Sequence, residues 1–265
     1  MPTHTPVLAE RLLALTYEAE RSHFWFRGFR QYMKPAIARA LDGVRDARIL
    51  DCGCGTGSNL EMLGRHGRAC GFDLARAGVR FARAHGHRVA QASIAAIPFP
   101  SDTFDLVTSF DVFQCLPENV ERLAIAEMAR VLKPGGAVLL HVAALEILHG
   151  KHSVLSEEVR RYTPARLRSI VEHGGFRIER LTFDHMSLLP MMLPVRAWHR
   201  MRAAGGKVEA GEGEITVPIA PVNAALTALV SLEAMALRAV NMPIGSSLMC
   251  LARKGVQSAE FRVQN

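Results

Sequence analysis

The chain has 265 residues, which is enough for one large α/β domain and too few for two full-sized ones. Hydrophobic residues make up 49% and charged residues 22%, a composition that excludes a disordered or low-complexity chain and predicts a sizeable buried core. The formal net charge of +7 favours an anionic partner. Charge alone leaves nucleic acid, an acidic lipid surface and an anionic substrate open.

We expect neither a secretory signal nor a membrane-spanning segment in this sequence. Charged residues such as Glu10 and Arg11 interrupt the first residues, so these do not have the form of a secretory signal. The apolar run Val222–Val240 contains Glu233 and Arg238, so we expect no transmembrane helix there. We therefore expect a cytoplasmic protein.

Five cysteines are scattered along the chain, and their number is odd. This pattern predicts reduced, mostly structural thiols. Cys52 and Cys54 form a C-x-C pair without a second cysteine or histidine pair nearby, and no acidic cluster of the cation-binding kind accompanies them. We expect no metal site.

The first predicted element is helical and covers Ala9–Leu41. It contains the segment Glu20–Arg27, in which three adjacent aromatic residues lie beside two arginines. Such a segment is unusual for a solvated helix face. Two interpretations stay open at this point: the aromatic residues hold the helix against the core, or the helix is a lid over an active site.

From Ala47 to Ala144 short apolar runs alternate with helical patterns, as in βαβ units with a parallel sheet. The sequence therefore predicts a doubly wound sheet. The expected strands are Arg48–Cys52, Ala69–Leu74, Arg88–Ala92, Phe104–Phe110 and Ala137–Val142, and the expected helices are Ser58–His66, Ala75–His85 and Asn119–Leu132, the last followed by a Lys-Pro-Gly-Gly helix stop and turn.

The rest of the chain is less regular. A helix over Pro164–His173 and a Gly-Gly turn lead into a strand at Phe176–Leu181. After an apolar run with two prolines and a basic stretch, Ala203–Gly213 reads as a polar, mobile link. Pro221–Val240 is an almost wholly apolar helix, and Ser247–Lys254 is the expected last strand.

The segment Ile49–Gly57 is a strand that runs into a glycine loop and then a helix. Glycines allow the backbone to approach a ligand closely, and the helix start offers free N–H groups. This much suits any nucleotide-like cofactor. The dinucleotide fingerprint G-x-G-x-x-G fits poorly, because counting from Gly53 places Ser58 at the third glycine position.

Charge narrows the choice of cofactor. Asp51 lies just before the loop, where a carboxylate would repel a pyrophosphate and attract a ligand with an ammonium and a sulfonium. Asp73 ends the second strand, the position at which such folds bind two ribose hydroxyls. The pattern predicts a positively charged nucleoside with a free ribose.

Four segments together, ILDCGCGTG, GFDLARAGVRFAR, IPFPSDTFDLVTSFDVFQCL and EMARVLKPGGAVLL, resemble the class I S-adenosylmethionine-dependent methyltransferases over about Arg48–Val142. The resemblance implies an α/β, Rossmann-like, doubly wound seven-stranded sheet of order 3-2-1-4-5-7-6. It also implies an N-terminal helical lid (1–46), a cofactor-binding core (47–185), a helical insert that shapes the acceptor site (186–246) and a final strand with a tail (247–265).

The flanks of the core are similar to those of a bacterial small-molecule subgroup of this family. The similar segments are His23–Arg27, Arg161–Thr163 and Asn241–Ser247. This likeness refines the expected architecture and leaves the substrate open.

The family's cofactor contacts carry over position by position. The glycines would line the methionine moiety, the acid after the second strand would bind the ribose, and the next residue would pack on adenine. Ser93 stands where the family usually has an aspartate. The implied cofactor-binding residues are Asp51, Gly53, Cys54, Gly55, Gly57, Asp73, Leu74, Ser93, Ile94 and Phe110; with a closed lid, Trp25 and Arg27 would join them, and Arg27 or Arg30 would pair with the methionine carboxylate.

Methyl transfer is an in-line displacement that depends mostly on positioning, so a base is optional. His141 at the end of the fifth strand is the candidate base, and the alternative is a core histidine satisfied by backbone groups. His149, His152 and Tyr162 follow on the connecting segment. We expect Asp111 and Tyr162 on the acceptor side, although Asp111 could instead cap a helix.

The insert begins with the apolar run Ser187–Val195, followed by basic residues. Such a run suits an anionic membrane surface or a lipid-like tail, or it is core. Our first hypothesis is O- or C-methylation of a small or lipid-linked acceptor. The alternatives are an RNA methyltransferase, favoured by the charge but lacking an RNA-binding module, and a non-catalytic cofactor-binding protein.

Overall fold

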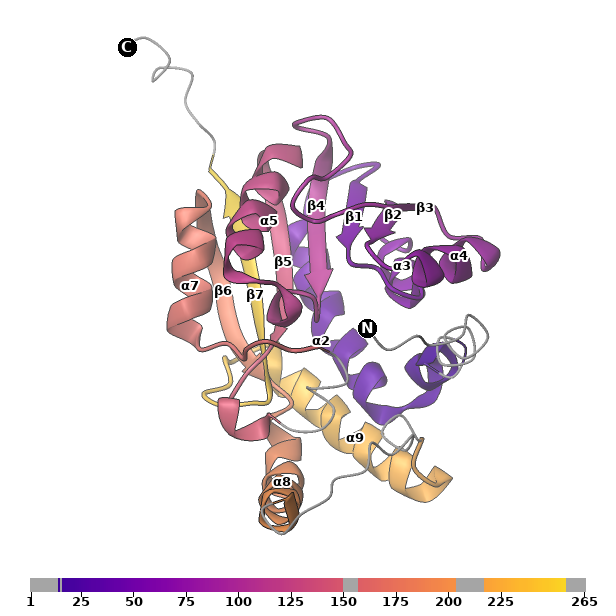
Figure 1. Cartoon of the computed structure of the whole chain (residues 1–265), viewed down its shortest axis with the longest axis vertical. Coiled ribbons are helices and arrows are strands. Elements are labelled where there is room, and N and C mark those ends of the chain that lie inside the picture. Colours follow the sequence, from indigo (N-terminus) through magenta and orange to yellow (C-terminus); the bar gives the residue numbers. More distant parts are fainter. Residues whose placement is uncertain (1–13, 15, 150–156, 204–216, 256–265) are drawn as a thin grey trace.

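The computed structural model describes residues 14, 16–149, 157–203 and 217–255. Seven strands form one sheet in the order β3-β2-β1-β4-β5-β7-β6, which confirms the predicted order (Figure 1). The strands are β1 (Arg48–Cys52), β2 (Arg68–Asp73), β3 (Val89–Gln91), β4 (Phe104–Phe110), β5 (Leu132–Ala143), β6 (Phe176–Asp184) and β7 (Ser247–Lys254).

Strand direction brings the candidate site together. Strands β1 to β5 pair in parallel, and β7 is antiparallel to both β5 and β6, so β6 runs in the same direction as the first five strands. The carboxyl ends of six strands therefore meet at one edge of the sheet, which we call the carboxyl edge. In this kind of fold, ligands bind outside that edge.

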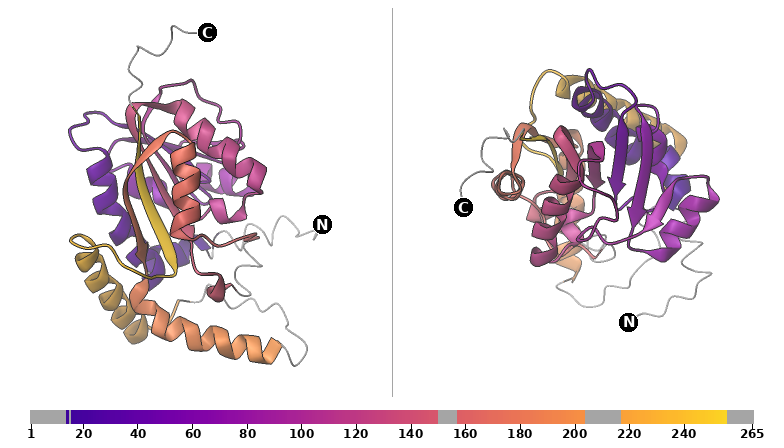
Figure 2. Two further views of the ribbon diagram at one scale, coloured as in Figure 1. Left: turned by 90° about the vertical axis from the view of Figure 1, so that its left-hand side faces the viewer. Right: turned by 90° about the horizontal axis from the view of Figure 1, so that it is seen from above.

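Helices cover both faces of the sheet, as side chains on a buried parallel strand require (Figure 2). Successive β5 residues show the alternation: Leu139 packs into one hydrophobic cluster and Leu140 into the other, and both are fully buried. One face carries α2 (Phe24–Ala40), α3 (Ser58–Leu63) and α9 (Ala220–Leu237), the other carries α5 (Glu118–Val131) and α7 (Pro164–His173), and α4 (Arg76–Ala84) packs against β2 and β3.

The insert between β6 and β7 is helical. It begins with the 3-10 turn η3 (Met186–Leu188) and continues as α8 (Leu189–Ala203) before α9. Figure 1 shows α8 and α9 beyond the carboxyl ends of the central strands. The helix predicted at the end of the insert is present as α9, whereas α8 was expected only as an apolar run with prolines. Most of the predicted link Ala203–Gly213 lies outside the described residues.

The start of β5 differs from its prediction. The Lys-Pro-Gly-Gly segment was expected to be a turn, but β5 begins at Leu132, which pairs with Phe104 of β4, and the register shifts before Leu106. Gly135 has a φ of 75°, a conformation that glycine adopts without strain, and it lets the strand continue through the irregularity. The segment is therefore part of the sheet.

The N-terminal helix is interrupted within its aromatic segment. Residues 16–22 are helical, and α2 starts anew after His23, whose Nδ1 accepts a hydrogen bond from the Trp25 N–H at 3.1 Å. Buried residues of α2, among them Phe29 and Ile37, belong to the same core cluster as α9. In this structure α2 is thus a packed layer of the fold.

Candidate functional site

The glycine loop after β1 is held in a shape that only glycine suits. The backbone N–H groups of Gly53 and Cys54 both donate to the Phe72 carbonyl, at 2.9 and 3.0 Å, which ties the loop to β2. Gly53 has a φ of 81°, and a Cβ there would lie 2.3 Å from the Val112 side chain. Gly55 has a φ of 51° with open space where a Cβ would be, so a ligand can approach its backbone.

Asp73 links the loop to the end of β2. Its Oδ2 accepts a hydrogen bond from the Gly55 N–H and its Oδ1 one from the Ala75 N–H, both at 2.8 Å. A carboxylate has about four acceptor sites, so hydroxyls of a ribose can still bind. The next residue, Leu74, is 72% exposed and offers an uncovered apolar surface for a base.

Asp51 is a buried acid with an unused oxygen. Its Oδ1 accepts a hydrogen bond from the Thr108 hydroxyl at 2.7 Å, while its Oδ2 has no partner among the described residues. Burial raises the pKa of Asp51 to about 7 against the lowering effect of the Thr108 bond, and nearby Asp73 raises it further. A ligand cation would satisfy this carboxylate. The carboxylates of Asp51 and Asp73 and the open glycine loop therefore fit S-adenosylmethionine, whose ammonium and sulfonium are positive.

The remaining predicted cofactor residues have side chains in the core or in a local turn. Cys54, Ile94 and Phe110 are buried. The Ser93 Oγ accepts a hydrogen bond from the Ala95 N–H at 3.2 Å. Any contact that Cys54 or Ile94 makes with a cofactor would therefore come mainly from the backbone.

Glu20 is a site residue that sequence reasoning missed. Its carboxylate accepts a 2.6 Å hydrogen bond from the Thr56 hydroxyl within the glycine loop, and burial raises the pKa of Glu20. Arg30 of α2 donates to the Glu20 carbonyl and lines a hollow together with Ser58. Arg27 is exposed, so of the two arginines Arg30 is the one beside the loop.

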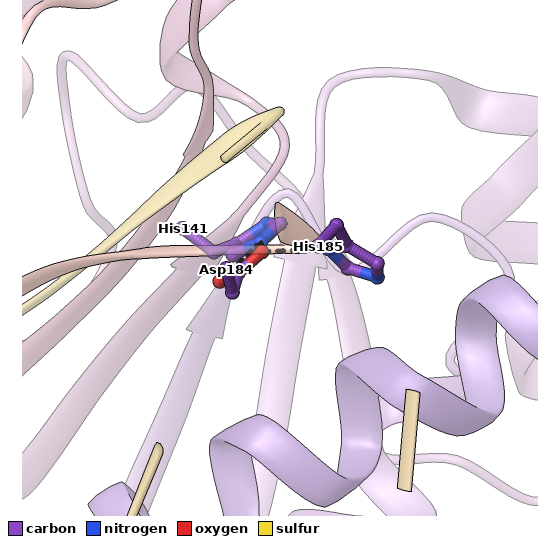
Figure 3. A group of neighbouring side chains, drawn as sticks. All are labelled: His141, Asp184 and His185. Atoms are coloured by element: carbon purple, nitrogen blue, oxygen red, sulfur yellow. Dashed lines mark hydrogen bonds and ion pairs between the residues drawn. The ribbon is translucent and has the colours of Figure 1, made fainter. Parts of the chain in front are cut away.

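A chain of charged side chains lies at the carboxyl ends of β4, β5 and β6, and Figure 3 shows its buried part. The Nδ1 of His141 lies 3.0 Å from Asp111 Oδ1, and its Nε2 lies 3.2 Å from Asp184 Oδ2. Burial lowers the pKa of His141, but the two carboxylates outweigh burial and raise it to about 10. His141 therefore carries its proton at neutral pH.

This state corrects the expectation of a core histidine satisfied by backbone groups, and it weighs against the role of general base. A histidine that keeps its proton up to about pH 10 does not act as a general base near neutrality. Its partners are carboxylates and not the backbone groups expected of a core histidine. His141 instead holds Asp111 and Asp184 in place at the carboxyl edge.

Asp184 and His185 extend the chain on its buried side. Burial would raise the pKa of Asp184, but the charge of His141 outweighs it and holds that pKa well below its usual range. His185 Nδ1 lies 2.6 Å from Asp184 Oδ1, and the indole of Trp25 stacks on the His185 ring with centroids 3.9 Å apart. Trp25, expected over the cofactor, therefore contacts the β6 end of the edge.

Ligand-type atoms of His141, Asp184 and His185 lie within 4.8 Å of one another, a grouping that the expectation of no metal site did not foresee. Hydrogen bonds to Asp184 account for this proximity. Binding a metal at this grouping would require His141 to release its proton. The pair Asp184–His185 was missed because we expected β6 to end at Leu181; a polar pair after a buried strand was the available signal.

Asp111 is the outer end of the chain of charges. Its side chain is half exposed, and its backbone has a φ of 58°. Partial burial would raise the pKa of Asp111, but the positive His141 outweighs it and lowers that pKa. The turn that follows has Val112 as its N-cap residue, without a side-chain cap. Asp111 is thus an ionised acid that faces solvent at the end of β4, next to β1. It does not cap the turn that follows.

Tyr162 does not lie where an acceptor could reach it. It is 1% exposed, and its N–H donates to the Ala143 carbonyl at 2.8 Å. Its hydroxyl donates to Glu121 of α5 and also lies 3.2 Å from the Phe113 carbonyl oxygen. Burial raises its pKa. In this structure Tyr162 therefore does not offer its hydroxyl to an acceptor, the role predicted for it, but anchors the chain after β5. His149 is partly buried, and His152 lies outside the described residues.

The sheet order, the glycine loop and the acid after β2 together define a class I methyltransferase fold. The family described as "Methyltransferase domain" matches residues 50–140. A solved S-adenosylmethionine-dependent methyltransferase from Archaeoglobus fulgidus has a TM-score of 0.54 and 15% identity, covering 85% of this chain and 94% of that one, which shows the same fold.

Two relatives extend the comparison beyond the fold. A malonyl-[acyl-carrier protein] O-methyltransferase from Herminiimonas arsenicoxydans is 30% identical, covering 72% of this chain and 78% of that protein. A tRNA (carboxymethyluridine(34)-5-O)-methyltransferase from Arabidopsis thaliana is 31% identical over 54% of this chain and 35% of its own length. The chain belongs to the class I S-adenosylmethionine-dependent methyltransferase family, and S-adenosylmethionine is its cofactor.

Proposed function

We propose that this methyltransferase acts at an oxygen or carbon atom of a small or lipid-linked acceptor. The supporting observation is the place of Asp111. It is an ionised, half-exposed carboxylate at the end of β4, next to β1 and its glycine loop, and its only side-chain ion pair among the described residues is with buried His141. An acceptor hydroxyl or enol that enters the edge can donate a hydrogen bond to it.

The cofactor supplies a methyl group on a positive sulfur, which leaves as a neutral thioether. Asp73 and the Gly55 backbone would hold the ribose and methionine parts, and Asp51 would provide the negative charge for the cationic groups. Asp111 orients the acceptor atom, and the proton that leaves a hydroxyl passes by way of this half-exposed carboxylate to water. Because its pKa is low, its contribution is mainly orientation, which is the larger part of this reaction's acceleration.

Transfer of a labelled methyl group tests the proposal directly. The protein is incubated with labelled S-adenosylmethionine and separate lipid, small-metabolite and RNA fractions, and we expect label in the lipid or small-metabolite fraction. Asp111→Asn should lower turnover at least about tenfold while cofactor affinity stays within about twofold. Asp42→Asn, at an exposed position, is the matched control.

RNA is the second candidate acceptor, because the net charge is +7 and a relative is a tRNA methyltransferase. Label that enters RNA alone would overturn our first choice. Absence of transfer to every fraction, with cofactor binding intact, would favour a non-catalytic cofactor-binding protein.

A further inference from the structure

Helix α9 turns its polar side chains toward the protein. Asn223 accepts a hydrogen bond from the Phe24 N–H at 2.8 Å and donates one to the Ser22 carbonyl at 2.9 Å. The Gln31 side chain donates to the Ser231 hydroxyl at 2.9 Å. These bonds attach α9 to α2, so the polar groups of this helix are used inside the fold.

The opposite side of α9 is apolar along its whole length. Leu232 and Met235 are each 64% exposed. The exposed residues of the helix, all without a polar side chain, are Ala220, Pro221, Val222, Ala224, Ala225, Ala228, Leu229, Leu232, Met235 and Ala236. A surface helix of a soluble domain has the reverse arrangement, with its apolar stripe toward the core. This outer side therefore matches an apolar environment better than water.

Helix α8 adds a second exposed apolar surface to the insert. Of its side chains that the structure describes, Leu189 is buried and Met192 is partly buried. The others are exposed and apolar: Pro190, Met191, Leu193, Pro194, Val195 and Trp198. Figure 2 shows α8 extending away from the sheet at the foot of the molecule. We call the exposed residues of α8 and α9 together the α8–α9 face; it exceeds the scattered apolar residues normal on a surface.

We propose that the α8–α9 face docks this enzyme onto an anionic lipid bilayer. Charge favours this occupant. The second half of α8 contains Arg196, Arg200 and Arg202, and the whole helix has no acidic residue. The one acid of α9, Glu233, is buried. An apolar helix surface next to a basic segment is the composition of helices that lie in the interface of acidic membranes.

A second copy of the chain is the main competing occupant. In a two-fold dimer the same surface of both subunits meets itself. A dimer with its two-fold axis near α8 would bring two arginine-rich segments together, and like charges would oppose that contact. An acidic lipid surface instead attracts a segment of this composition.

In this proposal helix α9 lies on the bilayer and does not cross it. By length and composition α9 could span a membrane, with a mean hydropathy of 1.5 and only 28% of its residues buried. Glu233, however, accepts hydrogen bonds from the N–H groups of Met186 and Ser187, at 2.9 and 2.8 Å, within the folded unit. Moving α9 into the bilayer would separate the Glu233 carboxylate from these two N–H groups and leave all of them unpaired.

Docking in this way would place the site next to lipid. Met186 and Ser187 directly follow Asp184 and His185, so Glu233 ties the α8–α9 face to the carboxyl edge. An acceptor anchored in the bilayer could thus reach Asp111 without leaving the membrane. This consequence rests on the proposed function, whereas vesicle binding itself requires neither acceptor nor turnover.

Vesicle flotation of the whole chain tests the docking. We expect it to float with phosphatidylglycerol/phosphatidylcholine vesicles and to bind pure phosphatidylcholine less. The double variant Leu232→Glu/Met235→Glu should reduce partitioning about tenfold or more, since two buried apolar side chains are replaced by charges. Leu123→Glu on α5, where the leucine is also exposed, is the matched control and should bind like the unmodified chain.

Each other outcome contradicts the docking. No binding to either vesicle, or equal loss in the control and the double variant, overturns it. A dimer in light scattering that Leu232→Glu/Met235→Glu converts to monomer, without vesicle binding, would make the face a self-association surface. S-adenosylmethionine affinity measured on the same samples shows whether the variants are folded, and the methyl-acceptor assay decides the proposed function separately.

Discussion

At Asp51, cofactor binding and stability have opposite requirements. The folded chain favours the protonated carboxyl, because burial raises its pKa from 3.8 to about 7, whereas a cationic ligand favours the ionised form. For an acid with a raised pKa, stability is lost as the pH rises from about 4 through 7. Asp51→Asn should therefore stabilise the cofactor-free protein at pH 8, by about 2 to 4 kcal/mol, and weaken S-adenosylmethionine binding.

Thermal unfolding at pH 8 and calorimetric titration of the cofactor measure the two effects. Asparagine keeps an oxygen that can accept the Thr108 hydrogen bond, so the change is mainly one of charge. Asp105→Asn, at another acid of the sheet, serves as a control for binding. Unchanged cofactor affinity in Asp51→Asn would contradict the assigned role.

His141 predicts a second pH dependence. Its pKa is raised from 6.5 to about 10 by Asp111 and Asp184 against the opposing effect of burial. The stabilisation is fully present below about pH 6.5 and is lost as the pH rises through 10. At pH 6, His141→Gln should cost about 3 to 5 kcal/mol of unfolding free energy, because it leaves two carboxylates without their cation.

Denaturant unfolding between pH 6 and 10 checks this, best in the Asp51→Asn background, since Asp51 also lowers stability as the pH rises. The fall across this range should be steep with His141 and shallow in His141→Gln. Equal slopes would show that His141 is not the titrating group.

The positions of single site residues could be predicted where they belong to a motif at the end of a strand. Asp51, Gly55 and Asp73 follow strands whose apolar pattern is clear, so their meeting at one edge could be expected. The pairing of His141 with Asp184 could not, because it joins β5 to a strand that is 43 residues further along and reaches the same edge only through the antiparallel β7.

Hydrogen bonds to its side chains hold helix α9 against α2 and η3. Glu233 accepts two backbone hydrogen bonds at the start of the insert, so Glu233→Ala would leave the Met186 and Ser187 N–H groups unpaired. We expect a loss of about 2 to 5 kcal/mol and faster proteolysis within α8. Glu118→Ala, at an exposed glutamate of α5, should change neither rate nor stability by more than about 0.5 kcal/mol. Equal proteolysis of both variants would contradict this.

Helices and strands could be predicted where the hydrophobic periodicity and the residues that start or stop an element agreed. Apart from β5, the strands of the sheet and α9 were found within a few residues of their predicted bounds. Helix α8 was not placed because Pro190 and Pro194 read as breakers. Pro190 lies in the first turn, where a proline loses no hydrogen bond, and the helix continues through Pro194. β5 was predicted too short, since nothing local shows that Leu132 pairs with Phe104.

Over the whole molecule, the cofactor should join parts of the chain that are far apart in sequence. The glycine loop touches Glu20 before the sheet, Asp73 at the end of β2 and, through Asp51, Thr108 of β4. A ligand that binds only this folded arrangement stabilises it by mass action, and at a hundredfold excess over its dissociation constant the gain is about 2.7 kcal/mol.

For a chain of this size that gain corresponds to a rise in Tm of about 5 to 10 °C with S-adenosylmethionine. NAD should produce no comparable rise, because its pyrophosphate would meet the negative charge of Asp51. Asp73→Ala should abolish the shift, since the ribose loses its acceptor and the Gly55 N–H its partner, whereas Asp42→Ala should retain it. A full shift in Asp73→Ala would mean that the cofactor is held elsewhere on the carboxyl edge.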